Sequence, residues 1–260
     1  MPNRWKGWPR LLPVIKSKKR ILLLFDFDGT LAPIVPVPQQ AHLPDETREV
    51  LCRLQANPRV TVAMISGRSL IDLKHKAFLY GAYYSGNHGL EISGPKIDYE
   101  YPGIRRHAKT ISHLARHFHE QFQSIPGSLV QDKGFSLSIH YRNVRTHDLA
   151  AFHDLIKQSI IVTSGLPIVW RKGRKVYEIM PAVDWNKGCA ALWLMKKLRD
   201  PYPLAFGDDK TDDTMFRALK RKGITTRIGR KRKLAHFSVK NPHRVYLFLR
   251  LLEKLLAMQR

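Results

Sequence analysis

The chain has 260 residues, of which 43% are hydrophobic, and its 45 Lys and Arg residues against 21 Asp and Glu give a formal net charge of +24. This apolar content is enough for a buried core and excludes a disordered chain, and no apolar run approaches the ~20 residues that span a bilayer. The basic start shows no signal-peptide pattern, because Pro9 and Pro13 break it and no apolar region follows. We therefore expect a cytoplasmic protein without membrane contact, with Cys52 and Cys189 as reduced core residues.

The positive charge is concentrated in two parts of the chain. Residues 214–252 contain no Asp or Glu, and the tail before Ile21 is similarly one-sided. The closely spaced basic residues of the first segment are Arg217, Lys220, Arg221, Lys222, Arg227, Arg230, Lys231, Arg232 and Lys233. Such a charge first suggests nucleic acid, but neither segment carries the interleaved aromatic residues that stack on RNA bases. We interpret both segments mainly as solvated surface and do not expect nucleic acid as the main partner.

In the first hundred residues, short apolar runs alternate with helical patterns. The runs at 21–25, 60–65 and 82–85 predict buried strands, because each is a short apolar stretch without polar alternation. One helix is expected at 45–55, and another is expected to start after Ser69 as its N-cap and to reach Phe78. This alternation predicts a parallel sheet with helices on both faces.

The middle of the chain has a different pattern. It contains a basic helix ending at Phe122, predicted strands at 128–131 and 135–141, a helix at 147–160, and predicted strands at 168–170 and 175–180. This order suits antiparallel pairing. We therefore predict an inserted α+β cap domain at 103–183, between two parts of a core domain at 1–102 and 184–260.

After this insertion the strand and helix alternation resumes. Helices are expected at 187–198, 211–220 and 242–257, and a buried strand is expected at 203–206. The predicted fold class is α/β, with a Rossmann-like parallel sheet in the core domain and an inserted α+β cap.

Two carboxylates directly follow the first predicted strand. Asp26 and Asp28 occupy alternate positions of an extended segment, so their side chains point the same way. They lie at the carboxyl end of a parallel strand, where open α/β sheets bind ligands. Gly29 permits a sharp turn after them. One carboxylate can attack phosphorus while the other transfers protons, so the pair indicates phosphoryl chemistry.

Three further features follow strands or open helices. Ser66, Gly67 and Arg68 end the second predicted strand, where a hydroxyl group and a backbone N–H beside a helix start form a phosphate cradle. Lys187 opens the helix after the insertion and can neutralise the nucleophile and the phosphoryl oxygens. The segment GDDKTDD at 207–213 is dense in carboxylates. Such a cluster repels itself unless a hard cation is present, and oxygen ligands beside a phosphate favour Mg²⁺.

In this order, the segments DFDGT, SGR, NKG and GDDKTDD resemble the four motifs of the haloacid dehalogenase superfamily. More closely, GNHGLE, QDKGFSLSIHYR, KVYEIMP and GDDKTDDTMF resemble trehalose-6-phosphate phosphatases, and the similarity runs from about Ile21 to Leu252. The resemblance implies a haloacid dehalogenase-type core with a cap. It also implies a Mg²⁺-dependent phosphatase that hydrolyses trehalose 6-phosphate, a small sugar phosphate, through an aspartyl-phosphate.

The resemblance implies roles for the motif residues. Asp26 would be the nucleophile, and Asp28 would protonate the leaving sugar oxygen and later activate water. Mg²⁺ would be bound by the carboxylates of Asp26 and Asp208 and by the backbone carbonyl of Asp28, with Asp212 in support. These positions would therefore form the catalytic and metal site.

The resemblance also implies phosphate and sugar contacts. Ser66 and Lys187 would steady the phosphoryl oxygens. The substrate-binding candidates are Gly67, Arg68, Asn87, His88, Gln131, Lys133, His140, Arg142 and Glu178.

Two positions depart from the family pattern for binding the distal glucose. Lys133 and Glu178 match it, but Gln131 stands where Glu is usual, and Met180 stands where Arg is usual. Gln lacks the charge of a carboxylate, and Met removes five donors and a charge. A related phosphatase that acts on sucrose phosphate or mannosyl-glycerate phosphate therefore remains an alternative. A nucleic-acid-associated protein on a phosphatase-like fold is a further one.

Overall fold

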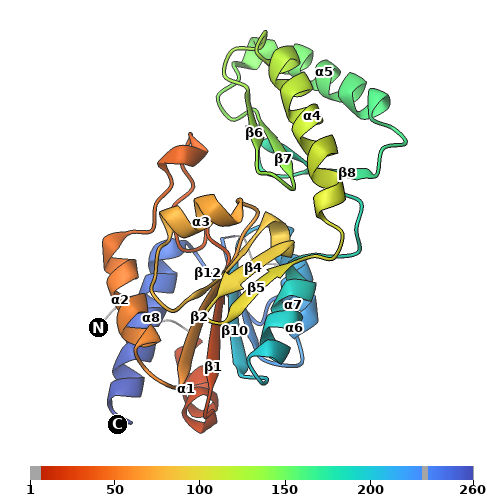
Figure 1. Ribbon diagram of the computed structural model, residues 1–260. Helices are drawn as coiled ribbons and strands as arrows, with labels where there is room; N and C mark the ends of the chain where they lie inside the picture. Colours follow the sequence, from red (N-terminus) through yellow and green to blue (C-terminus); the bar gives the residue numbers. More distant parts are fainter. Residues whose placement is uncertain (1–6, 230–233, 260) are drawn as a thin grey trace. The chain divides into compact units, whose positions relative to one another are not determined.

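Figure 1 shows the computed structural model, which describes residues 7–229 and 234–259. The chain forms two compact units, and each is described by itself. The core unit comprises Met1–Tyr99 and Trp185–Arg260, and the inserted unit comprises Glu100–Asp184. In the described part of the chain, no helix combines the length and the apolar character that crossing a membrane requires.

The core unit is built on an eight-stranded sheet in the order β12-β11-β10-β1-β2-β3-β4-β5. Its strands are β1 (Ile21–Phe25), β2 (Val60–Ile65), β3 (Tyr83–Gly86), β4 (Glu91–Gly94), β5 (Ile97–Glu100), β10 (Tyr202–Gly207), β11 (Ile224–Ile228) and β12 (Phe237–Val239). The pairs from β12 to β3 are parallel, and β3 pairs antiparallel with β4. The loops after β1, β2 and β10 therefore meet at one edge of the sheet.

Helices cover both faces of this sheet (Figure 1). They are α1 (Trp8–Ser17), α2 (Asp45–Gln55), α3 (Leu70–Lys76), α6 (Lys187–Lys197), α7 (Asp212–Leu219) and α8 (Pro242–Ala257), with short 3₁₀ helices η1 (Pro38–Gln40) and η2 (Asn87–Gly89). The side chains of successive residues of β1 point to opposite faces of the sheet. Leu23 packs with α2 and α8, and Leu24 packs with α6 and α7. Burial on both faces is the reason for the unbroken apolar sequence of β1.

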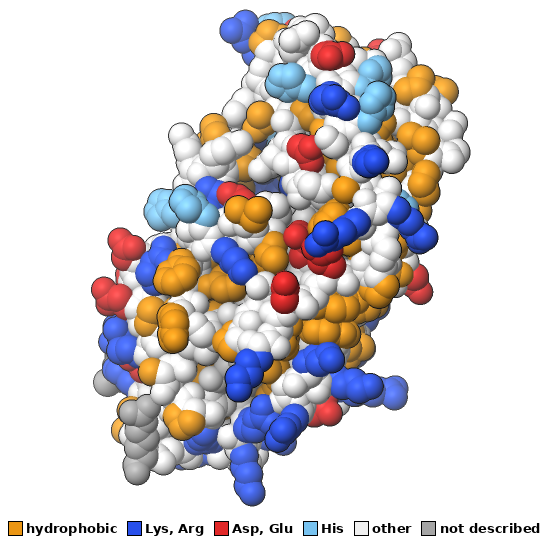
Figure 2. Space-filling model, viewed as in Figure 1, with side chains coloured by type: hydrophobic (Ala, Val, Ile, Leu, Met, Phe, Trp, Pro, Cys, Tyr) orange, Lys and Arg blue, Asp and Glu red, His pale blue; other side chains and the backbone are white. Residues whose placement is uncertain are grey.

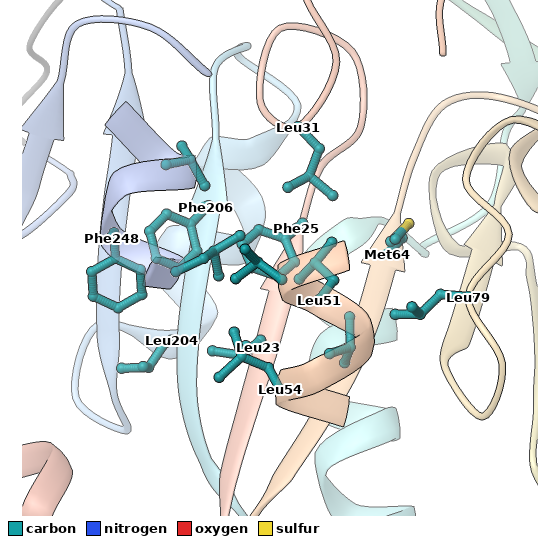
Figure 3. Close-up of a cluster of buried hydrophobic side chains, with 14 of the residues drawn as sticks. Leu23, Phe25, Leu31, Leu51, Leu54, Met64, Leu79, Leu204, Phe206 and Phe248 are labelled. Atoms are coloured by element: carbon teal, nitrogen blue, oxygen red, sulfur yellow. The ribbon is translucent and has the colours of Figure 1, made fainter. Parts of the chain in front are cut away.

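Aliphatic side chains, with Phe25, Phe206 and Phe248 among them, fill the core on the α2 and α8 face (Figure 3). The ring centroids of Phe25 and Phe206 lie 5.0 Å apart, and those of Phe206 and Phe248 lie 5.1 Å apart. These contacts join β1, β10 and α8, so the two strands that end in the acidic motifs are fixed next to each other.

The first helix of the core unit was not expected. Pro9 lies in the first turn of α1, where the N–H that proline lacks has no partner in the helix. Pro13 lies inside the helix and removes one internal hydrogen bond. Leu11 and Ile15 are buried in the core on the α2 and α8 face, and this packing maintains the helix. The expectation that the two prolines break this segment is therefore wrong.

Burial of the cysteines also differs from the expectation. Cys52 is exposed and Cys189 is partly buried. The core-facing positions of α2 include Leu51 and Leu54, and Cys52 lies outside that stripe. The prediction of a core cysteine is wrong at position 52.

The inserted unit has a four-stranded antiparallel sheet in the order β6-β7-β9-β8, backed by two helices. Its elements are α4 (Arg105–Phe122), β6 (Leu129–Asp132), β7 (Leu137–His140), the 3₁₀ helix η3 (Thr146–Asp148), α5 (Leu149–Val162), β8 (Ile168–Lys172) and β9 (Val176–Pro181). Phe118 and Phe122 of α4 and Phe152 of α5 pack against Ile139 and Ile179 of the sheet. One face of the sheet is therefore committed to the helices, and the alternate residues lie on the other face.

Candidate active site

A buried lysine joins two carboxylates at the carboxyl edge of the core sheet. Asp26 directly follows β1, and Lys187 is the first residue of α6, which Asn186 caps with its side chain. The Lys187 Nζ donates hydrogen bonds to Oδ1 of Asp26 and to Oδ1 of Asp212, each at 2.7 Å. The exposed fraction is 5% for Asp26, 2% for Lys187 and 0% for Asp212, so solvent screens these charges little.

The pKa values reflect this crowding. Burial raises the pKa of the Asp26 carboxyl well above its usual range against the opposing charge of Lys187, and Asp212 and Asp208 raise it further. Burial, together with Asp212 and Asp209, raises the pKa of Asp208 to about 7. Burial alone would lower the pKa of Lys187, but its ion pairs with Asp212 and Asp26 outweigh burial and raise it, so the lysine stays charged.

The same carboxylates form a group that fits a metal ion. Asp26, Asp208 and Asp212 each offer one oxygen, and these three oxygens lie within 4.8 Å of one another. Gly29, at a positive φ of 80°, brings the loop after β1 so close to Asp208 that a Cβ at this position would lie 2.3 Å from its Oδ2. Three carboxylate oxygens around one point suit a hard cation such as Mg²⁺, and a single lysine does not neutralise them.

Asp28 is bound by an arginine from the next strand end. Arg68, which follows β2, donates through Nε and Nη2 to both carboxylate oxygens of Asp28, each at 2.6 Å. Its Nη1 donates to Asp72 at 2.6 Å, and its Nη2 also donates to the carbonyl oxygen of Pro38 at 2.9 Å. The Arg68 side chain is 7% exposed and that of Asp28 is 41% exposed, so Asp28 keeps one open side. Arg68 thus contacts Asp28, and its predicted contact with substrate stays a prediction.

The loop 86–91 folds over the end of β2. The backbone N–H of Asn87 donates to the carbonyl oxygen of Arg68 at 2.7 Å, and that of His88 donates to the carbonyl oxygen of Ser66 at 2.9 Å. Asn87 and His88 adopt left-handed φ values of 48° and 58°, and Trp185 Nε1 donates to the Gly89 carbonyl oxygen at 2.7 Å. Ser66, Asn87 and His88 are all buried here. The structure therefore places these residues with Arg68, beside the strand end that carries Asp26.

Arg227, which the sequence analysis interpreted as part of a basic surface, is a buried residue that contacts the acidic loop at 207–213. Arg227 of β11 is 1% exposed, donates to the Asp209 carbonyl oxygen at 2.7 Å and forms an ion pair with Asp213. Its guanidinium carbon lies 5.2 Å from the ring centroid of Phe216. The interpretation as solvated surface is wrong for Arg227, because residues 225–228 of β11 are all buried. Residues 230–233 of the same basic run lie outside the described residues.

The inserted unit gathers most of its predicted sugar-binding residues on one face of its sheet. Ser138 of β7 is registered with both Gln131 of β6 and Glu178 of β9, so the three side chains form a row. The Lys133 Nζ lies 3.4 Å from Glu178 Oε1, and His140 Nε2 lies 3.2 Å from Gln131 Oε1. This row is a set of polar groups suited to sugar hydroxyls.

Arg142 and Met180, two other residues of this unit, do not add polar groups to this row. Arg142 donates instead to the Arg174 carbonyl oxygen at 3.1 Å. Met180 follows Glu178 by two positions on β9 and is 2% exposed. A buried thioether at this place offers a sugar no hydrogen bond donor.

Known proteins are similar to this chain over most of its length. The family model for trehalose-phosphatase matches residues 24–251. Trehalose-phosphate phosphatase B of Arabidopsis thaliana is 31% identical over 250 residues, which cover 89% of this chain and 66% of that protein, so the chain spans about two thirds of that relative's length. Probable trehalose-phosphate phosphatase 3 of Oryza sativa subsp. japonica is 32% identical over 96% of this chain and 74% of that protein.

Solved structures show the same fold. Trehalose-6-phosphate phosphatase of Aspergillus fumigatus is similar over 95% of this chain and 97% of that chain, with 27% identity and a TM-score of 0.63. The C-terminal domain of the Candida albicans trehalose-6-phosphate phosphatase covers 95% of this chain and 96% of that chain at a TM-score of 0.80 and 23% identity, which supports the fold alone. The predicted α/β fold class is confirmed. The chain belongs to the trehalose-phosphatase family and, with it, to the phosphoric monoester hydrolases.

Proposed function

We propose that this protein hydrolyses trehalose 6-phosphate to trehalose and phosphate, with Asp26 as the nucleophile. The observation that carries the proposal is the buried contact of Lys187 with Asp26 and Asp212, beside Asp208 at the carboxyl edge of the sheet. A carboxylate next to a fixed cation and a metal-binding group is suited to phosphoryl transfer, which requires mainly alignment and charge neutralisation. The names of the plant and fungal relatives support the choice of substrate.

We propose Mg²⁺ as the cofactor. Asp26, Asp208 and Asp212 would hold it, and the backbone carbonyl of Asp28 is the further ligand implied by the family resemblance. When bound, the ion would neutralise charge on the phosphoryl oxygens. The chemistry of the donor set supports this ion, because all three side chains offer carboxylate oxygens and no nitrogen or sulfur.

The reaction would proceed in two displacements. A carboxylate oxygen of Asp26 attacks phosphorus, the bond from phosphorus to the sugar oxygen breaks, and Asp28 gives its proton to that oxygen. Asp28 then takes a proton from water, the water oxygen attacks phosphorus, and the acyl-phosphate bond breaks to return Asp26 as carboxylate and to release phosphate. Arg68 would orient Asp28 through its two hydrogen bonds while the exposed side of Asp28 receives the substrate. Lys187 and Ser66 would steady the phosphoryl oxygens.

Sugar recognition would come from the inserted unit. Gln131, Lys133 and Glu178 lie on one face of its sheet, and together they offer donors and acceptors for the glucose that does not carry the phosphate. His140 contacts Gln131 and would set the orientation of its amide. This unit would act as a cap that closes over the sugar and excludes water during the first displacement.

A second candidate substrate class is another phosphorylated disaccharide or glycoside, such as sucrose phosphate or mannosyl-glycerate phosphate. The observation that favours it is the pair Gln131 and Met180, because a neutral amide and a buried thioether replace two charged groups of the family pattern. The mechanism at Asp26 would be the same for either substrate.

The test is phosphate release with Mg²⁺ from trehalose 6-phosphate, sucrose 6-phosphate, mannosyl-glycerate phosphate and glucose 6-phosphate, with EDTA as the metal-free control. Selective hydrolysis of trehalose 6-phosphate supports the first proposal. Selective hydrolysis of another sugar phosphate supports the second candidate substrate class and leaves the proposed mechanism at Asp26 unchanged. If none of these compounds releases phosphate in a metal-dependent way, the proposed function is contradicted.

A further inference from the structure

The edge of the core sheet opposite the carboxylates carries an unusual concentration of positive charge. Figure 2 shows Lys and Arg side chains gathered over the lower end of the view, where Figure 1 places α1. The segments 18–20, 196–202 and 220–223 lie at this edge, because they precede β1, β10 and β11 or end the helices that lead back to those strands. We call their basic residues the basic end: Lys18, Lys19, Arg20, Lys196, Lys197, Arg199, Lys220, Arg221 and Lys222.

The basic end is concave and has little opposing charge. An open hollow of about 430 Å³ is lined by Lys18, Lys19, Arg20 and Lys222, together with Asp200, Met195, Pro201 and Tyr202. Asp200 is the single acidic residue in the three segments that form the basic end. An anion that enters this hollow therefore meets lysine and arginine from two separate parts of the chain, residues 18–20 and residue 222.

Part of this charge has a structural use. Arg20 donates to the carbonyl oxygens of Leu198 and Arg199 at the end of α6, and Lys18 lies 4.7 Å above the ring centroid of Tyr202. Lysines in the last turn of α6 also offset its helix dipole.

Lys19 and Lys222 are different. Both are exposed, neither lies in a helix, and neither forms an ion pair with any residue in the described ranges 7–229 and 234–259. Both line the same hollow, where like charges repel each other. A bound polyanion would remove that repulsion.

We propose that the basic end binds the phosphate backbone of a double-stranded nucleic acid, independently of base sequence. Nine basic residues on three segments form a wider field than a single phosphate group needs, whereas a duplex presents phosphates along its length. Single strands are bound mainly by stacking on aromatic residues, and Tyr202 at this end is covered by Lys18. A membrane surface fits less well, because the described residues of the three segments include no exposed large hydrophobic side chain.

This activity would be separate from the phosphatase site. β1 begins after Arg20 and ends at Phe25, directly before Asp26, so its five residues separate the two edges by roughly 17 Å. Changes at Lys19 and Lys222 therefore leave the catalytic carboxylates untouched, and the proposal does not depend on the function proposed above.

The test uses the full chain and a short mixed-sequence DNA duplex, with binding followed by fluorescence anisotropy between about 50 and about 200 mM salt. The variant carries Lys19→Glu and Lys222→Glu. The matched control carries Lys109→Glu and Arg116→Glu, two exposed positions on α4 that change the net charge equally. We expect the Lys19 and Lys222 variant to lose at least tenfold in affinity at the lower salt concentration, and the slope of log affinity against log salt to become shallower by about 2. The control is expected to change affinity less than threefold.

Thermal unfolding and phosphatase activity of both variants test whether the fold is intact. A second variant, Lys19→Gln with Lys222→Gln, removes the charges without reversing them and is expected to weaken binding to a smaller extent. Three results overturn the proposal: no binding of duplex at the lower salt concentration, equal losses in the variant and the control, or binding to phosphatidylserine vesicles without binding to duplex.

Discussion

Lys187 is held between Asp26 and Asp212, with its ammonium nitrogen 2.7 Å from one oxygen of each. The side chains of Asp26, Lys187 and Asp212 are buried. Asp208 adds a third carboxylate, and one oxygen each of Asp26, Asp208 and Asp212 lie within 4.8 Å of one another. One lysine cannot neutralise three carboxylates in a place from which water is largely excluded. The remaining negative charge would favour the binding of a divalent cation, as proposed above.

Replacement of this lysine should affect both activity and stability. Lys187→Met leaves two buried carboxylates without their cation, which costs about 3 to 5 kcal/mol when one partner of a buried pair is removed. It also removes a donor from the phosphoryl oxygens, so we expect turnover to fall by at least about 10²-fold. Lys197→Met at the exposed end of the same helix is the control and is expected to change neither quantity measurably. Denaturant unfolding and phosphate release measure the two effects, and a fully active Lys187→Met protein would contradict the assignment.

The raised pKa of Asp208 predicts a pH dependence of stability. A carboxyl group whose pKa rises on folding, here from 3.8 to about 7, binds protons more readily in the folded chain than in the unfolded chain. In EDTA the free energy of unfolding should therefore decrease as pH rises from about 4 to about 7. Mg²⁺ should stabilise the protein more at pH 8 than at pH 5, because the carboxylates must be ionised to bind it.

Thermal unfolding across this pH range, with EDTA and with Mg²⁺, measures both trends. Asp208→Asn should flatten the metal-free profile and reduce the stabilisation by Mg²⁺. An increase of stability with pH between about 4 and about 7 in EDTA would show that this carboxyl does not keep its raised pKa.

At the scale of elements, the strands of the core unit that could be predicted from the sequence are those buried on both faces of the sheet. β1, β2 and β10 are continuous apolar runs because helices cover both faces of the sheet, and they were predicted. β4, β5 and β12 are only three or four residues long and carry polar side chains, so they give no comparable pattern. β11 lies in the basic segment, where the excess of lysine and arginine hid its buried residues.

The location of the site could be predicted for the same reason. Asp26 and Asp208 follow apolar strands that pair with each other, and Lys187 and Asp212 open helices after the insertion and after the acidic loop. The pairing of Arg68 with Asp28 could not be predicted, because it joins side chains from different strand ends. Nor could the pairing of Arg227 with Asp213, since no local pattern specifies which carboxylate an arginine meets.

Arg227 gives a prediction for β11. Arg227→Met leaves Asp213 and the Asp209 carbonyl group without their buried donor, and we expect a loss of about 3 to 5 kcal/mol in the free energy of unfolding. Arg221→Met, an exposed neighbour in the same basic segment, is expected to stay within about 0.5 kcal/mol of the unchanged protein. Denaturant unfolding of the two variants compares them directly. Equal effects would show that β11 does not hold Arg227 in the core unit.

At the scale of the whole molecule, two units supply different parts of the proposed reaction. The core unit contains the carboxylates, Lys187 and the Arg68 pair, and the inserted unit contains the polar row that includes Gln131 and Glu178. This division predicts that changes in the inserted unit alter the choice of sugar, whereas changes in the core unit abolish the chemistry. Gln131 and Met180 depart from the family pattern that the resemblance implies, so a different choice of sugar would arise at these two positions.

The measurement that tests the central claim most directly is the turnover of Asp26→Asn with trehalose 6-phosphate and Mg²⁺. The change is nearly isosteric, so the fold should persist, and removal of the attacking oxygen's charge should reduce turnover by at least about 10³-fold. Asp98→Asn, at an exposed position of β5, is the control and should stay fully active. Acid-quenched protein of the unchanged sequence should carry one phosphoryl group on the peptide that contains Asp26, and the Asn variant should carry none. Substantial turnover by a folded Asp26→Asn protein would contradict the account.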